Sequence, residues 1–153
     1  MLRCFGATIG AGCRVYPGVR LWAPWNLVMG DGSVLADGVD CYSMATVTLG
    51  ARAIVSQGGH LCAGGHDYES RNFQLVAEPI SIGAHAWLCA GAFVGPGVTV
   101  GAGAVIGARA VVVKDMPAWT VCAGNPCRPL KPRLFRPESA GGPKPDSAAP
   151  WKP

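Results

Sequence analysis

The chain has 153 residues, of which half are hydrophobic and only 14% are charged, so it is long enough for one domain with its own core. Its formal net charge of +4 lies entirely in residues 128–153, because basic and acidic residues are equal in number in residues 1–127. This short basic segment is too weak a signal for a nucleic-acid-binding protein, and it suits a small phosphorylated ligand better.

The seven cysteines include no CxxC pair, so the sequence predicts neither a zinc motif nor a disulfide framework. No uninterrupted apolar run approaches the roughly 18 residues that span a bilayer. The first six residues lack the apolar core of a signal peptide. We therefore expect a cytoplasmic protein that requires no metal and does not insert into a membrane.

An apolar residue recurs at every sixth position along most of the chain. The first series starts at Ile9, and the second, which starts at Met29, is two residues out of register with the third, which starts at Leu49. A fourth series starts at Ile82, with a glycine after most of its members. The members are Ile9, Val15, Leu21; Met29, Leu35, Cys41; Leu49, Val55, Leu61; and Ile82, Leu88, Val94, Val100, Ile106, Val112.

A period of six is typical of a parallel β-helix and fits neither the period of about 3.6 of an α-helix nor that of about 2 of a strand. Three short strands, each with one aliphatic side chain inward, make one triangular coil, and successive coils stack. The sequence therefore predicts an all-β solenoid over residues 1–133. Residues 134–153, rich in Pro, Ser, Ala and Gly, are predicted to form a flexible tail. Periodicity does not give the hand of the coil, although the crossover rule favours a right-handed one.

The sixfold count stops after His66. The next apolar position would fall at residue 67, but it falls at Ile82, so an inserted loop is predicted over residues 67–81. A loop of this length that leaves a tight coil is more often functional than idle. We expect His66 at a corner of the coil, beside the loop. Histidine has a pKa close to neutral pH, so it can accept a hydroxyl proton and return it.

The repeated pattern of aliphatic residue, glycine and small residue resembles the hexapeptide acyltransferases. The stretch ISIGAHAWLCAGAFVGPGVTVGAGAVIGARAVVVKDMP, followed by VCAGNPCRPLK, resembles the galactoside and maltose acetyltransferases. The stretches VSQGGHLCAGGHDY and AEPISIG resemble the colanic-acid-biosynthesis type. The resemblance covers about residues 25–133, and it implies a left-handed coil. Family members usually carry a longer N-terminal segment than this chain does.

The resemblance implies an O-acetyltransferase that moves the acetyl group of acetyl-CoA to a sugar or polysaccharide hydroxyl, with direct attack and His66 as general base. The backbone of Ala90 and Ala108 would bind the pantetheine arm, and Lys114 would face the nucleotide. A basic pair would lie near the 3′-phosphate, namely Arg128 and Lys131. Val113 departs from the galactoside-type enzymes, which have Thr there, so one hydroxyl contact to the donor is missing.

The acceptor side is less defined by the sequence, which does not identify the sugar. Tyr68 and Phe73, in the predicted loop, are suited to stack on a pyranose ring. Tyr42 and Ser43 lie where the family often has an Asn that helps hold the acceptor or the oxyanion, and the Ser43 hydroxyl could donate one hydrogen bond there. Trp87 stands at the family's Trp position and either packs against a neighbouring subunit or lines the acceptor cleft. An N-acetyltransferase acting on the amine of a nucleotide sugar is the alternative.

Three further expectations concern assembly and rival chemistries. The flat, charge-poor sides of the coil favour a homotrimer with shared sites. His60 is expected at a solvated corner and His85 at a structural corner, and the spacing of the three histidines does not match the zinc site of γ-class carbonic anhydrases. Cys62 and Cys89 flank the site in sequence, but nothing indicates an activated thiolate for a covalent route.

Overall fold

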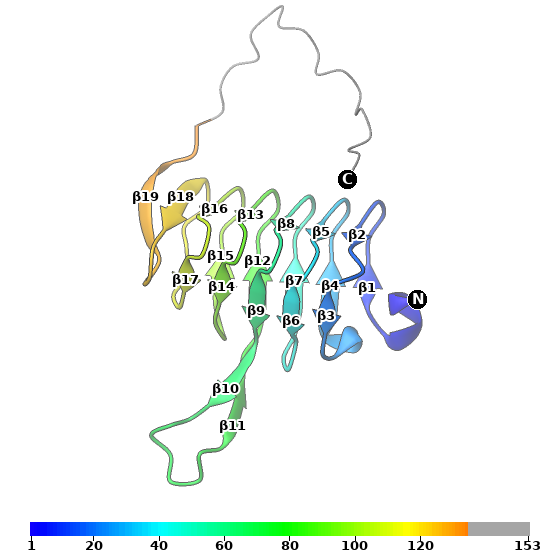
Figure 1. Ribbon diagram of the computed structural model, residues 1–153, viewed down its shortest axis with the longest axis vertical. Helices are drawn as coiled ribbons and strands as arrows, with labels where there is room; N and C mark the ends of the chain where they lie inside the picture. Colours follow the sequence, from blue (N-terminus) through cyan, green and yellow to red (C-terminus); the bar gives the residue numbers. More distant parts are fainter. Residues whose placement is uncertain (135–153) are drawn as a thin grey trace, which may run out of the picture.

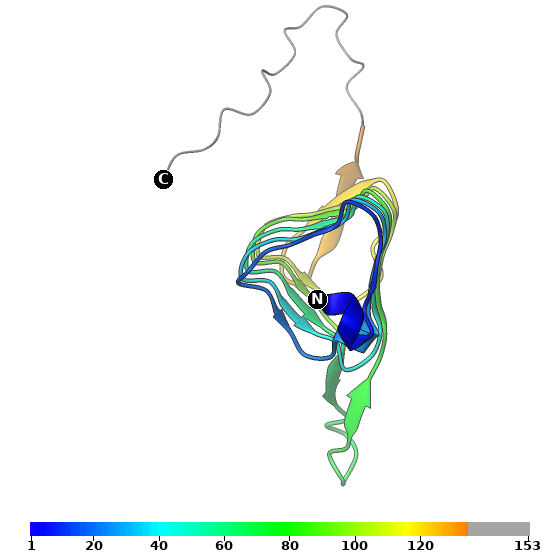
Figure 2. The ribbon, with the colours of Figure 1, turned by 90° about the vertical axis from the view of Figure 1, so that its right-hand side faces the viewer.

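The computed structural model describes residues 1–134, and it confirms the predicted parallel β-helix. Short strands wind into a solenoid of about six coils (Figure 1). Viewed along its axis, the solenoid is triangular, and its three flat sides are three sheets in which the strands of successive coils are parallel (Figure 2). We name these sheets faces A, B and C, in the order in which the chain passes through them.

Each face stacks strands from successive coils. Face A contains β1 (Thr8–Ile9), β4 (Leu27–Met29), β7 (Val47–Leu49), β12 (Ile80–Ile82) and β15 (Thr99–Val100). Face B contains β2 (Arg14–Val15), β5 (Val34–Leu35), β8 (Ile54–Val55), β13 (Trp87–Leu88), β16 (Val105–Ile106), β18 (Thr120–Ala123) and β19 (Arg128–Pro132). Face C contains β3 (Arg20–Leu21), β6 (Asp40–Tyr42), β9 (His60–Cys62), β14 (Phe93–Val94) and β17 (Val111–Val112).

The core contains most of the apolar residues that recur every six positions, because they point inward from their strands, together with small corner residues and with Leu27, Val47 and Ile80 of face A. On face B, for example, like positions lie in register from coil to coil and are fully buried: Leu35, Val55, Leu88, Ile106 and Cys122. Removal of these side chains from water is the main force that holds the coils together.

The first coil is less well covered than the others. Val15, the inward residue of β2, remains 37% exposed. A 3₁₀ helix, η1 (Leu2–Phe5), lies over part of this end of the solenoid (Figure 2), and Leu2 packs against the core. The open end therefore contributes less hydrophobic stabilisation than the middle coils do.

The corner between face C and the next strand of face A, the CA corner, varies in length. Leu21 and Met29 are eight residues apart, as are Cys41 and Leu49, although both pairs occupy successive inward positions. The first of these longer corners contains the second 3₁₀ helix, η2 (Pro24–Asn26). The two-residue shift in the sixfold pattern therefore arises from longer corners. The inward residues of successive coils still lie opposite one another.

The inserted segment leaves at the same CA corner as an antiparallel hairpin of β10 (Gly64–His66) and β11 (Leu75–Ala77). Its boundaries differ from the predicted loop at 67–81. Ile80 and Ser81 belong to the coil, because Ile80 pairs with Val47 and is buried. Gly64–His66, which the sixfold count assigned to the coil, belongs to the hairpin instead. The count failed here because Gly65 fits the small position of a hexad equally well.

The last two strands close the solenoid. β18 continues face B in parallel, and β19 returns antiparallel to it. Beyond β19, Arg133 Nη1 donates to the carbonyls of His85 and Gly103, at 3.0 and 2.8 Å, and its guanidinium lies over the Trp119 ring. The predicted tail at 134–153 lies, apart from Leu134, outside the described residues. No helix within residues 1–134 has the length and apolar character needed to cross a membrane.

Candidate functional site

His66 lies on the hairpin that projects from the CA corner (Figures 1 and 2). It is the last residue of β10 and pairs with Leu75 of β11. The predicted position at a corner of the coil is therefore wrong, because the backbone has already left the coil at Gly64. The imidazole is consequently held beyond the surface of its own solenoid.

The hairpin fixes the tautomer of His66. Its Nδ1 lies 2.8 Å from the carbonyl oxygen of Phe73. Because a carbonyl oxygen only accepts hydrogen bonds, Nδ1 must carry the proton, and Nε2 is left with a free lone pair. The Phe73 ring stacks on the imidazole with a centroid distance of 4.6 Å and an angle of 5° between the planes. The exposed imidazole is thus held on one face and at one nitrogen.

The turn between β10 and β11 is ordered by its own hydrogen bonds. Asp67 Oδ1 accepts from the backbone N–H groups of Glu69 and Ser70, at 3.1 and 3.2 Å. The Phe73 N–H donates to the Ser70 carbonyl at 3.0 Å and holds Phe73 at a φ of 43°. Phe73 is thereby placed in the left-handed region, which non-glycine residues rarely adopt. The carbonyl that orients His66 is therefore positioned by the turn itself.

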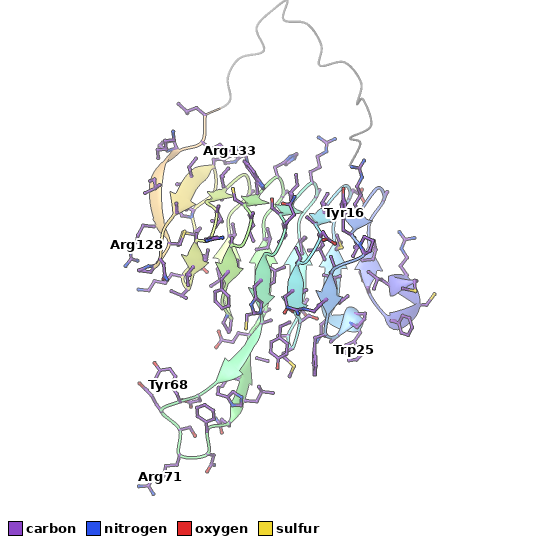
Figure 3. All side chains as sticks on the ribbon, in the orientation of Figure 1. Tyr16, Trp25, Tyr68, Arg71, Arg128 and Arg133 are labelled. Atoms are coloured by element: carbon purple, nitrogen blue, oxygen red, sulfur yellow. The ribbon has the colours of Figure 1, made fainter. Side chains whose placement is uncertain are left out.

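Two of the predicted acceptor residues lie on this hairpin. Tyr68 is 81% exposed, and together with Arg71 it lies at the end remote from the coil (Figure 3). Phe73 is also exposed, but one face of its ring is already covered by His66. Phe73 therefore orients the histidine, and only its second face is open to a ligand.

Ser43 does not have the predicted environment. Its side chain is fully buried, and its Oγ accepts from the N–H of Ala23 and donates to the Ala23 carbonyl, both at 3.1 Å. The one hydroxyl proton is used inside the chain, so the expected hydrogen bond to an acceptor or oxyanion is wrong. Ser43 ties two successive CA corners together.

Trp87 lies on face B, and its Nε1 donates to Ser56 Oγ at 2.9 Å. Face B does not meet the CA corner from which the hairpin projects (Figure 2). Trp87 and His66 therefore do not line a common site within one chain. Trp87 remains 44% exposed, so its outer ring surface is open to a neighbouring chain.

Ala90 and Ala108 follow strands of face B at the corner between faces B and C, the BC corner. They lie in successive coils, and the Ala90 carbonyl accepts from the N–H of Arg109 at 2.9 Å. Within residues 1–134, the N–H groups of Ala90 and Ala108 and the carbonyl of Ala108 have no hydrogen-bond partner. This exposed row of donors and an acceptor matches what the amide groups of an extended ligand require.

The predicted basic residues lie on two parts of the molecule. Lys114 is exposed at the CA corner that follows β17. Arg128 and Lys131 are exposed on β19, where Figure 3 shows Arg128 at the end of the solenoid. One chain thus brings Arg128 close to the BC corner but leaves Lys114 and His66 on the far side of face C.

The same architecture is found in proteins of known family. Residues 79–114 match the family model described as bacterial transferase hexapeptide (six repeats). Over 134 residues the chain is 43% identical to the Escherichia coli (strain K12) protein named as colanic acid biosynthesis acetyltransferase WcaF, covering 88% of this chain and 74% of that one. The chain belongs to the hexapeptide-repeat acetyltransferases.

Solved structures of this family show the same fold. A maltose O-acetyltransferase from Clostridium difficile 630 superposes with a TM-score of 0.81 at 28% identity, over 88% of this chain and 73% of that one. A galactoside acetyltransferase in complex with coenzyme A gives a TM-score of 0.80 at 31% identity, over 87% and 68% of the two chains. A coil of opposite hand would not superpose in this way, so this chain shares the hand of those enzymes.

The other histidines of this hexapeptide-repeat acetyltransferase have structural environments. His60 lies on β9 and not at the expected corner, and its half-buried ring packs edge-on against Phe93 at 5.3 Å. His85 is at a corner, as expected, with a φ of 59° and a carbonyl that accepts from Arg133. Residues 1–134 contain no group of three or more His, Cys, Asp or Glu side chains arranged to hold a metal ion.

The cysteines of the acetyltransferase show no sign of activation. Burial raises the pKa of the Cys89 thiol, because the thiolate loses its hydration. The Cys62 Sγ donates to the carbonyl of Gly64 at 3.2 Å. In the described part of the chain no thiol hydrogen-bonds to a histidine, so a Cys–His pair for nucleophilic attack is not formed.

Sequence reasoning singled out Tyr42 but missed the polar and aromatic pocket that it lines on the outside of face C. It is lined by Arg20, Leu21, Trp22, Asp40 and Tyr42. A signal was present in the sequence, because outward positions of face C recur twenty residues apart in the first two coils, at residues 20 and 40 and at 22 and 42. The sixfold count followed only the inward residues and therefore passed over them.

Proposed function

We propose that the protein transfers the acetyl group of acetyl-CoA to a hydroxyl group of a sugar or polysaccharide precursor by direct attack, with His66 as the general base. The observation that carries this proposal is the hydrogen bond between His66 Nδ1 and the Phe73 carbonyl, which leaves Nε2 as an acceptor. As the hydroxyl oxygen bonds to the thioester carbon, Nε2 takes its proton, and the C–S bond then breaks. The proton passes to the departing sulfur.

The Phe73 carbonyl has a second effect in this step. When Nε2 takes the proton, the imidazole becomes positively charged, and the hydrogen bond at Nδ1 strengthens because its donor is now charged. The ring stacked on the imidazole also prevents it from rotating away. Proton transfer then requires little rearrangement of the hairpin.

The BC corner supports acetyl-CoA as the donor. The pantetheine arm contains two amide groups, and the open N–H and C=O groups of Ala90 and Ala108 complement them. The exposed cations Arg128 and Lys131 are suited to the phosphate groups. The galactoside acetyltransferase that superposes on this chain is described in complex with coenzyme A, which supports the same donor here.

Lys114→Ala is expected to raise the KM for acetyl-CoA about tenfold, the effect of one lost charge-assisted contact, with little change in kcat. The comparison variant is Arg14→Ala, which removes an exposed cation from β2, remote from the proposed donor groove. Initial rates of CoA release at varied acetyl-CoA would measure both effects. An unchanged KM for Lys114→Ala would remove this residue from the proposed donor site.

A complete site needs a second copy of the chain, which supports a homotrimer. In one chain, face C separates His66 from the BC corner. Face B also carries a column of outward apolar side chains in register, which suits contact between chains: Val34, Ile54, Trp87, Val105 and Val121. Closed threefold association would cover this column and bring the hairpin of one subunit to the donor groove of the next.

Light scattering on the purified protein is therefore expected to give three times the chain mass of 15.8 kDa. Ile54→Lys places a charge in the apolar column, where Ile54 is 40% exposed, and is expected to dissociate the assembly and reduce turnover at least tenfold. The control Phe5→Lys, at an exposed residue of η1 outside the three faces, should remain trimeric. A monomeric wild-type enzyme with full activity would contradict the shared site.

The acceptor class can be tested by spectroscopic detection of free CoA with a panel of sugars, oligosaccharides and amino sugars. The expected result is acetylation of a hydroxyl group of a neutral saccharide, with the product identified by mass spectrometry. Mild alkali removes an acetyl ester but not an acetyl amide, so it distinguishes the two products. Exclusive acetylation of amino groups would replace the O-acetyltransferase assignment by the N-acetyltransferase one. Turnover with none of these acceptors would contradict both.

A further inference from the structure

We propose that face C carries a second sugar-binding subsite, which holds the neighbouring pyranose ring of an oligosaccharide acceptor. Four side chains of the first two coils form it: Arg20, Trp22, Asp40 and Tyr42. The proposal rests on the proposed acetyl transfer and extends it, since it makes a saccharide of two or more rings, rather than a free monosaccharide, the preferred acceptor.

The pocket is built by two adjacent parallel strands. β3 and β6 lie in register, with Arg20 opposite Asp40 and Leu21 opposite Cys41. Cys41 is buried in the core, so the residues on either side of this inward pair point outward. The outward side chains form the pocket at the surface, and Leu21 also lines it.

Its aromatic part is Trp22 with Tyr42. Their ring centroids are 5.6 Å apart and their planes are inclined by 59°. Trp22 is 65% exposed, although burial of this large apolar side chain would be favourable. The ring faces carry partial negative charge, and the axial C–H groups of a pyranose carry partial positive charge, so the two surfaces attract. An exposed tilted aromatic pair is therefore suited to a sugar ring.

Its polar part is the ion pair between Arg20 and Asp40. Arg20 Nη2 donates to Asp40 Oδ2 at 2.7 Å, while 78% of the Arg20 side chain remains exposed. Such a surface pair contributes only about 0–1 kcal/mol to stability. In residues 1–134, the remaining guanidinium N–H groups and Asp40 Oδ1 make no other hydrogen bond. They are open donors and acceptors, which is what sugar hydroxyls require.

One residue of the pocket, Tyr42, adjoins the base of the hairpin that carries His66. The Tyr42 carbonyl accepts from the N–H of Ala63 at 3.0 Å. The Tyr42 ring lies so close to Gly64, the first residue of β10, that a Cβ there would be 3.0 Å from Tyr42 Cε1. Parallel strands are about 4.8 Å apart, so β3 to β9 spans about 10 Å, or about two linked pyranose rings. One ring beside the hairpin would place the next on Trp22.

The test compares Trp22→Ala with Trp25→Ala, because the two tryptophans have nearly the same exposure, 65% and 67%. Trp25 lies on η2 (Figure 3) and does not line the pocket. The full-length protein, labelled and saturated with CoA, is applied to an array of immobilised mono- and oligosaccharides. We expect wild type and Trp25→Ala to bind oligosaccharides, and Trp22→Ala to lose at least tenfold of this binding while remaining folded by circular dichroism.

Kinetics separate this proposal from the proposed function. For an acceptor pair such as glucose and maltotriose, or galactose and lactose, Trp22→Ala should raise KM about tenfold for the longer member only, with kcat retained. Oligosaccharide binding that depends on Trp22 without acetylation of any saccharide would keep the subsite and contradict the acetyl transfer. The subsite would be overturned if Trp22→Ala left the acetylation kinetics of both members unchanged. It would also be overturned if the wild type bound none of the arrayed saccharides.

Discussion

His66→Ala is expected to reduce kcat by about a thousandfold, the middle of the range for loss of a general base, with the KM for acetyl-CoA nearly unchanged. The imidazole is exposed on the hairpin and supports no core packing, so the coil should keep its stability. Initial rates of CoA release and thermal denaturation, measured on the same preparation, check both parts.

Two control variants sharpen this result. His66→Gln keeps a side-chain N–H that can donate to the Phe73 carbonyl but has no basic nitrogen, so it should be as inactive as His66→Ala. His60→Ala removes a histidine that packs on Phe93, and it should stay within about threefold of wild-type kcat. Turnover near the wild-type rate in both His66 variants would show that the hairpin histidine is not the base.

Gly83→Ala is expected to destabilise the protein by about 3 kcal/mol or more. A Cβ at Gly83 would lie 2.6 Å from the Cα of Ala102 and 2.7 Å from the carbonyl carbon of Gly101, which are backbone atoms of the next coil. Neither atom can move without opening the stack. Thermal denaturation should show a decrease of the order of 10 °C in Tm.

The matched control is Gly58→Asn. Gly58 has a φ of 63°, a region that Asn tolerates, and nothing lies within 4 Å of the position of its Cβ. This variant should cost less than about 1 kcal/mol. If Gly83→Ala were as stable as Gly58→Asn, the contact of Gly83 with the backbone of the next coil would not determine the distance between the coils.

The core of this fold could be predicted from sequence because the inward residue of each strand is apolar and recurs at a fixed spacing. Residues such as Leu88 and Ile106 repeat every six positions, and only a coil of short parallel strands gives them a common interior. The longer corners after Leu21 and Cys41 were visible as a shift of register. The family relationship followed from the same repeats.

The site was less predictable because it depends on contacts between residues outside the repeat. The orientation of His66 depends on a carbonyl at Phe73, and a carbonyl leaves no mark in the sequence. Ser43 was assigned to the acceptor because it lies where the family often has an Asn, but its hydroxyl is buried and bonds to the backbone of Ala23. The start of the hairpin was predicted too late because glycines occur both within the coils and at Gly64, where the chain leaves the coil.

The hairpin leaves and re-enters the coil at almost one point, since the N–H of Glu78 donates to the Ala63 carbonyl at 3.0 Å. The packing of the coils on either side therefore does not depend on the length or the composition of the inserted hairpin. The hairpin is therefore a segment that can be exchanged. Evolution or engineering could insert a different segment between Ala63 and Glu78 and change the substrate, while the β-helix folds as before.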